Sequence, residues 1–78
     1  MRYGASSKLP PEKVIDKAKA YFEKLGLKVV NEGSCTVSME GAGSSVSVTA
    51  SGENETDVEI ETTELSHQVK QFIQMISE

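Results

Sequence analysis

The chain has 78 residues, a formal net charge of −4 and a single cysteine. A chain of this length forms one small domain, and such a domain has little stability to offset the strain of a deep active site. One cysteine permits no internal disulfide, and no apolar run is long enough for a signal peptide or a membrane span, so we expect a cytoplasmic protein that binds no membrane. The acidic balance disfavours binding to nucleic acids, which depends on neutralising phosphates.

Charge is distributed unevenly along the chain. Residues 1–28 carry seven of the eight Lys and Arg residues and three acids, a balance of +4. Residues 29–78 carry one Lys and nine acids, a balance of −8. The basic and acidic parts can therefore attract each other, and we expect a homodimer as one outcome of this attraction.

The N-terminal third predicts a tail followed by a helix. Residues 1–8 are small or polar and show no periodicity, so we expect a flexible tail ahead of a single domain at 9–78. Residues 9–12 (LPPE) are typical of a helix start, and apolar residues then recur at spacings of three and four up to Leu25. Gly26 is placed to end this helix in the C′ position, where Leu27 makes the apolar contact of such a cap.

The middle of the chain predicts four strands. Apolar and polar residues alternate over four segments that are separated by short turns at 31–34, 41–44 and 51–54. The alternation places the lone Cys35 in phase with Val37 and Met39, so we expect it to point inward as a small buried side chain. The predicted strands are residues 27–32, 35–40, 45–51 and 55–62. Such short turns favour an antiparallel meander.

A second amphipathic helix is predicted after residue 63, with an apolar stripe at Leu65, Val69, Phe72, Ile73 and Ile76. The predicted fold is therefore an α+β two-layer sandwich, in the order helix, four-stranded antiparallel meander, helix. Four strands make a sheet about 19 Å wide, which two helices packed about 8–10 Å apart can cover. We therefore expect both helices on one face of the sheet and the opposite face bare.

The most specific pattern in the sequence is a row of acids at 53, 55, 57, 59 and 61, with Val58 and Ile60 between them. Its simplest interpretation is an edge strand that is protected by charge from pairing with other sheets. The functional interpretation is a docking surface for a basic partner. A divalent-cation site is disfavoured, because one strand cannot supply six to eight converging oxygens. Together with the neighbouring hydroxyl rows, this pattern predicts eight partner-binding residues: Thr36, Ser38, Ser47, Thr49, Glu55, Asp57, Glu59 and Glu61.

No group of residues in the sequence predicts catalysis. Residues 41–45 (GAGSS) lack the lysine and the following helix of a phosphate-binding loop, and no Cys or His pair has metal-ligand spacing. Ser66 and His67 are adjacent on a helix and therefore point apart. We expect no enzyme activity, no cofactor and no metal.

The sequence thus favours a non-catalytic interaction module that binds a protein partner, or itself, through an open polar and acidic sheet face. One alternative is a small nucleic-acid-binding domain, since the same order of elements is part of the TATA-binding protein repeat, which grips DNA with an open sheet. None of that family's motifs is present, and carboxylates on the open face would repel phosphate. The other alternative is a carrier with a small-ligand pocket between helices and sheet.

Overall fold

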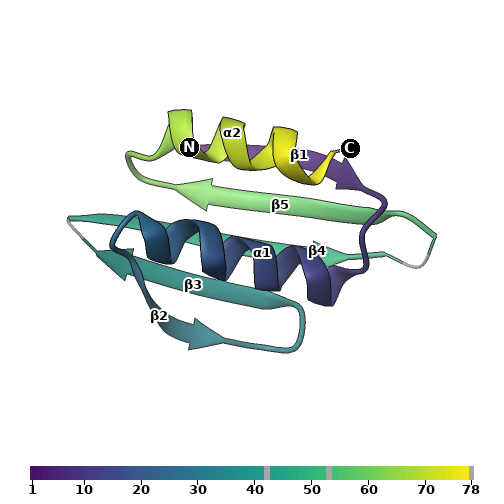
Figure 1. Cartoon of the computed structure of the whole chain (residues 1–78), viewed down its shortest axis with the longest axis horizontal. Coiled ribbons are helices and arrows are strands. Elements are labelled where there is room, and N and C mark those ends of the chain that lie inside the picture. The colour runs from purple at the N-terminus through teal and green to yellow at the C-terminus, as the bar shows by residue number, and fades with distance from the viewer. Residues whose placement is uncertain (42, 53, 78) are drawn as a thin grey trace.

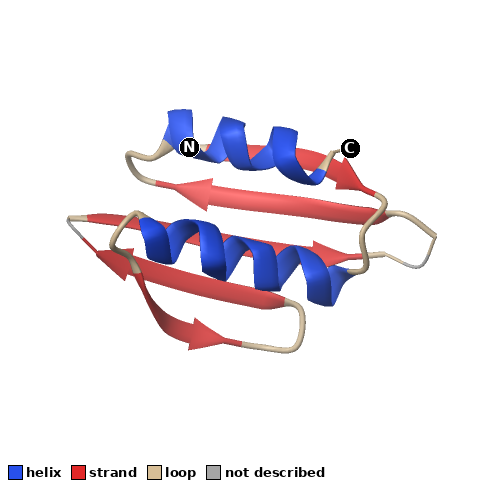
Figure 2. Cartoon of the chain, viewed as in Figure 1, coloured by secondary structure: helices blue, strands red, loops and turns tan. Residues whose placement is uncertain are grey.

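The computed structural model describes residues 1–41, 43–52 and 54–77, and within them the chain forms five strands and two helices (Figure 1, Figure 2). The elements are β1 (Arg2–Ser7), α1 (Pro11–Lys24), β2 (Lys28–Glu32), β3 (Thr36–Gly41), β4 (Ser44–Ser51), β5 (Thr56–Thr62) and α2 (Ser66–Ile76). Ala42 and Glu53, which fall in two of the predicted turns, lie outside the described residues.

Helix α1 begins and ends as the sequence predicts. Pro11 occupies its first turn, where a missing N–H costs nothing, and the buried side chains follow the predicted spacing. At its end, the Gly26 N–H donates to Glu23 (3.0 Å) and the Leu27 N–H donates to Phe22 (3.1 Å). Gly26 has a φ of +94°, and Leu27 is buried, so the helix closes in a Schellman cap.

The sheet has the strand order β1-β5-β4-β3-β2, and every neighbouring pair is antiparallel. Strands β2 to β5 form the predicted meander, which confirms the α+β class and the antiparallel pairing. Four strands, however, were expected and five are present. Helix α1 carries the chain from β1 at one edge of the sheet to β2 at the other (Figure 1).

The fifth strand comes from the predicted tail, so the expectation of a flexible segment at residues 1–8 is wrong. Residues 2–7 pair in continuous register with β5, from Arg2 opposite Glu61 to Ser7 opposite Thr56. The side chains of residues 4–7 are too small to show a hydrophobic period, and the backbone ladder supplies the order. Consequently β5 is an interior strand and not the edge strand that its charges suggest.

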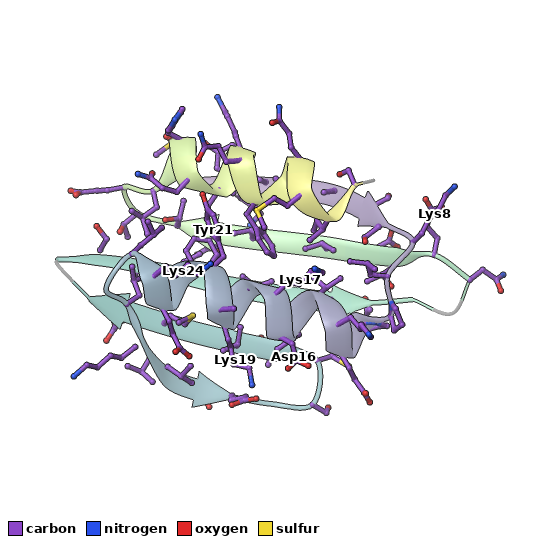
Figure 3. The ribbon with its side chains drawn as sticks, in the orientation of Figure 1. Lys8, Asp16, Lys17, Lys19, Tyr21 and Lys24 are labelled. Atoms are coloured by element: carbon purple, nitrogen blue, oxygen red, sulfur yellow. The ribbon has the colours of Figure 1, made fainter. Side chains whose placement is uncertain are left out.

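Strand β2 departs from simple alternation because of a bulge between Val29 and Asn31. The extra residue reverses the phase of the strand, so Glu32 pairs with Val37 and points toward the helix layer. There its carboxylate meets Lys19 Nζ of α1 at 2.8 Å; Figure 3 shows Lys19 on the side of α1 that faces β2. Val29 was expected inside but stays 37% exposed at this edge.

One hydrophobic core lies between the helices and the sheet. The buried faces of α1 and α2 and the inward residues of β3, β4 and β5 belong to one cluster, and Figure 1 shows both helices in front of the sheet. Cys35 is not part of this core, which corrects the prediction. It lies in the loop before β3 and is exposed, while its carbonyl accepts a hydrogen bond from the Ala50 N–H at 2.9 Å.

Candidate functional site

The sheet face that points away from the core carries three kinds of side chain in rows. Hydroxyls project from β3 and β4, carboxylates project from β5, and β1 contributes one cation followed by two small residues. In strand order the members are Thr36 and Ser38, then Ser47 and Thr49, then Asp57, Glu59 and Glu61, then Arg2, Gly4 and Ser6. We call this surface the open face.

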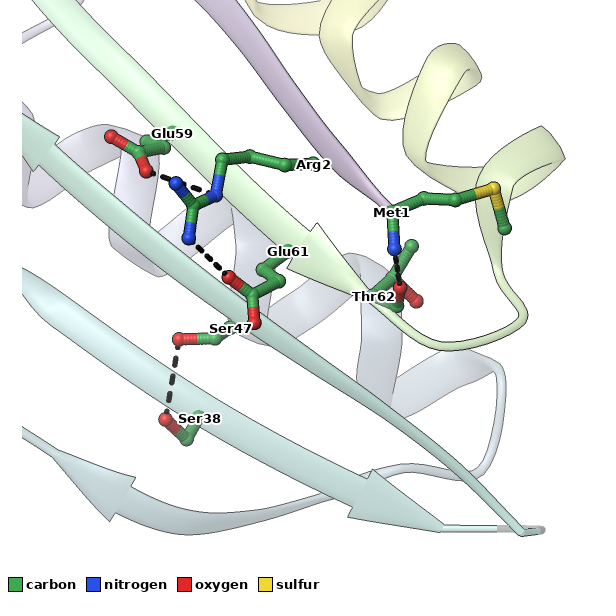
Figure 4. A network of polar contacts seen from close by, with 7 residues as sticks. All are labelled: Met1, Arg2, Ser38, Ser47, Glu59, Glu61 and Thr62. Carbon is green, nitrogen blue, oxygen red and sulfur yellow. Dashed lines mark hydrogen bonds and ion pairs between the residues drawn. The ribbon is translucent and has the colours of Figure 1, made fainter.

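The hydroxyl rows interact with each other across β3 and β4. Thr36 lies directly opposite Thr49, and their Oγ1 atoms are 3.2 Å apart. Ser38 lies opposite Ser47 with an Oγ–Oγ distance of 3.5 Å (Figure 4). The Thr36 hydroxyl also donates to the Val48 carbonyl at 3.1 Å. The four hydroxyl residues are thus brought together as predicted, in an arrangement that ordinary solvated β residues share.

Arg2 organises the carboxylate row. Its Nη2 donates to Glu61 Oε2 at 2.9 Å, and its Nε lies 3.5 Å from Glu59 Oε1 (Figure 4). The hydrogen bond to Glu61, assisted by the charges of both carboxylates, raises the pKa of the Arg2 guanidinium above its ordinary value. Arg2 was not among the predicted site residues, because it lies in the segment that was predicted to be a tail. Its positive charge, opposite in sign to the row of acids elsewhere in the sequence, is the one feature that could have pointed to it.

The remaining acids of the predicted row are not placed alike. Asp57 projects from the open face beside Ser6, and no ion pair to it is found among the described residues. Glu55 precedes β5 and is exposed in the turn. The strand portion of the row therefore consists of Asp57, Glu59 and Glu61, and Glu53 lies outside the part of the chain that is described.

Two hollows indent the open face. One, of about 560 Å³, lies over β2 to β5, and its lining includes Val30, Ser38, Ser47 and Glu61. The other, of about 700 Å³, lies over β4, β5 and β1. Gly4, Ser6, Asp57 and Glu59 line it, so small side chains surround two carboxylates. Arg2 lines both hollows and stands between them.

Other chemically active residues do not form a second site within residues 1–41, 43–52 and 54–77. No group of three His, Cys, Asp or Glu side chains there has a metal-binding arrangement. His67 is exposed on α2 and contacts Gln71, one turn further along the helix, at 3.3 Å. No helix among these residues is long and apolar enough to cross a membrane.

Comparison with known proteins does not assign the chain to a family. The chain matches no protein-family model, and no curated protein sequence matches it significantly.

Proposed function

We propose that this protein is a non-catalytic interaction module that binds a basic protein partner through the open face. The observation that carries the proposal is the position of the carboxylate row on an interior strand. Charges on an edge strand protect a sheet from pairing, but β5 has strands on both sides. Edge protection therefore does not account for Asp57, Glu59 and Glu61. Apart from solubility, binding a partner is the role that remains for these carboxylates.

The charge of the open face favours a basic partner. Three of its members are carboxylates, Asp57, Glu59 and Glu61, and one member, Arg2, is a cation, which leaves a balance of −2. A field of one sign above a hollowed surface steers a partner of opposite charge and sets its orientation. The proposal also depends on both helices occupying the other face, which leaves this one uncovered.

A binding role is favoured over a catalytic one because the sequence assembles no nucleophile, base and orienting group. We also propose that the open face can bind a second copy of the chain. Binding to either partner is proposed to take place in the cytoplasm.

The test is an affinity capture from lysate with three proteins. The first is the wild type, and the second carries Asp57→Lys, Glu59→Lys and Glu61→Lys. The third is a matched control that has the same change in charge away from the open face: Glu12→Lys, Glu23→Lys and Glu64→Lys. Circular dichroism verifies that all three proteins are folded. We expect a protein that the wild type and the control recover and the open-face variant does not. Equal recovery by all three would show that the open face is not the docking surface.

A further inference from the structure

The two edges of the sheet differ in how they are protected. Strand β2 has a bulge, carries Lys28, and points the charged Glu32 toward the helix layer. Natural sheets use these three features to prevent other strands from pairing with an edge. Strand β1 has an uninterrupted register over six residues, and its residues 4–7 are small and uncharged. Of the two edges, β1 is the one left able to pair.

The backbone groups that β1 offers follow from its pairing with β5. The Met1 ammonium donates to the Thr62 carbonyl (2.7 Å), and the Thr62 N–H donates back to the Met1 carbonyl (2.9 Å), so these residues form a hydrogen-bonded pair. In an antiparallel ladder such pairs alternate with pairs whose N–H and C=O groups face outward. Arg2, Gly4 and Ser6 therefore present their backbone donors and acceptors to the outer side of β1.

Helix α2 lies over β1 and forms one wall beside this edge (Figure 1). Its Gln71 accepts a hydrogen bond from the Tyr21 hydroxyl of α1 at 3.2 Å, so that flank of α2 faces α1. The opposite flank, which includes Ile73, faces outward above the β1 edge. Ile73, Tyr3 and Ala5 are partly buried side chains at the rim of the core. A strand added to β1 would lay every second side chain against this apolar rim.

The alternate side chains of an added strand would point to the open face, where the hollow of about 700 Å³ begins. Residues that pair with Gly4 and Ser6 would share rows with Glu59 and Asp57, two strands away at about 10 Å. Gly4 has no side chain, and a Cβ built on it would meet no atom within 4 Å. Long basic side chains of an added strand can therefore extend across β1 to both carboxylates.

We propose that the partner enters as a sixth strand on β1. This strand is an extended segment with apolar residues toward α2 and Lys or Arg residues toward Asp57 and Glu59. The inference rests on the proposed function, because it uses the carboxylates of the same open face. A second copy does not fit the edge in the same way. Its own β1 carries one cation, Arg2, and residues 4–7 of that strand are small and uncharged, so it does not supply a row of Lys or Arg residues toward Asp57 and Glu59.

The test is a ¹H–¹⁵N NMR titration with two blocked eight-residue peptides, one of alternating Lys and Val and one of alternating Glu and Val. We expect the Lys–Val peptide to shift the amide signals of Gly4 and Ser6, whose N–H groups become hydrogen-bonded. The Glu–Val peptide should bind roughly tenfold more weakly or worse. Ser6→Pro removes an outward donor without breaking the ladder to β5, and it should weaken Lys–Val binding by a similar factor. Ser6→Ala is the matched control and should bind like the wild type.

Each contrary result has a distinct meaning. Equal binding of the Lys–Val peptide to the wild type and Ser6→Pro, with shifts confined to Ser47 and Thr49, would overturn strand addition and leave the open face as the docking surface. Equal binding of both peptides would overturn the basic character of the strand. A wild-type dimer in sedimentation that Ser6→Pro converts to a monomer would identify a second copy as the occupant. No binding of the Lys–Val peptide to the wild type would also overturn the inference. The proposed function of the open face would then still be tested separately, by the capture experiment with the Asp57→Lys, Glu59→Lys and Glu61→Lys variant.

Discussion

At the scale of single residues, a buried hydroxyl joins the two ends of the chain. The Ser7 hydroxyl donates to the Ile76 carbonyl at 2.6 Å and accepts from the Leu9 N–H at 3.1 Å. Ser7→Ala leaves both backbone groups without this partner, so we expect the free energy of unfolding to fall by about 1–3 kcal/mol. Urea denaturation measures it. Ser6→Ala, one position away on the open face, should change it by less than about 0.5 kcal/mol. Equal losses in both variants would contradict a specific role for Ser7.

An exposed ion pair predicts a change at alkaline pH. The hydrogen bond from Lys19 to Glu32 raises the pKa of the Lys19 ammonium above its ordinary value of 10.5. A group whose folded-state pKa is raised stabilises the fold below its unfolded pKa, and this contribution is lost as pH rises through the folded pKa. Between about pH 10 and pH 12 the wild type should therefore lose more thermal stability than Lys19→Met. Parallel melting curves over this range would show that the pair contributes nothing.

At the scale of elements, the sequence predicts those whose side chains carry a period. Both helices and strands β3, β4 and β5 have apolar residues at the spacing that their burial requires, and the structure contains them. Strand β1 has no such signal, because Gly4 to Ser7 are small and their partners on β5 lie about fifty to sixty residues away in the sequence. The bulge in β2 could not be predicted from the sequence either. No residue type in this strand indicates the one-residue shift in register that turns Glu32 inward.

The alternating backbone of β1 gives a prediction that two neighbouring proline substitutions test. The Ala5 N–H faces β5 in the ladder, whereas the Ser6 N–H faces outward. Ala5→Pro should therefore lower the free energy of unfolding by about 3 kcal/mol or more, while Ser6→Pro should cost little. Urea denaturation of the two variants measures the difference. Equal stability would mean that β1 does not hold the register described above.

At the scale of the whole molecule, the uneven charge of the sequence becomes a set of contacts between its basic and acidic parts. Arg2 contacts Glu59 and Glu61 across β1 and β5, and Lys19 contacts Glu32 across α1 and β2. The charge distribution led us to expect attraction between two copies of the chain, whereas these ion pairs form within one chain. Of the eight predicted site residues, the structure gathers seven on the open face and leaves Glu55 in a turn. Arg2 was missed because only the fold carries the N-terminus to β5.

The position of Arg2 predicts how salt affects stability. Without its guanidinium, Glu59 and Glu61 repel each other on one strand with no cation between them, so Arg2→Met should lower the melting temperature at low ionic strength. At about 1 M NaCl, where the screening length is about 3 Å, the difference from wild type should shrink. Lys8→Met removes the same charge from an exposed residue near the other end of β1, and it should show little of this dependence. If both variants respond alike, net charge governs the effect and Arg2 does not organise the carboxylate row.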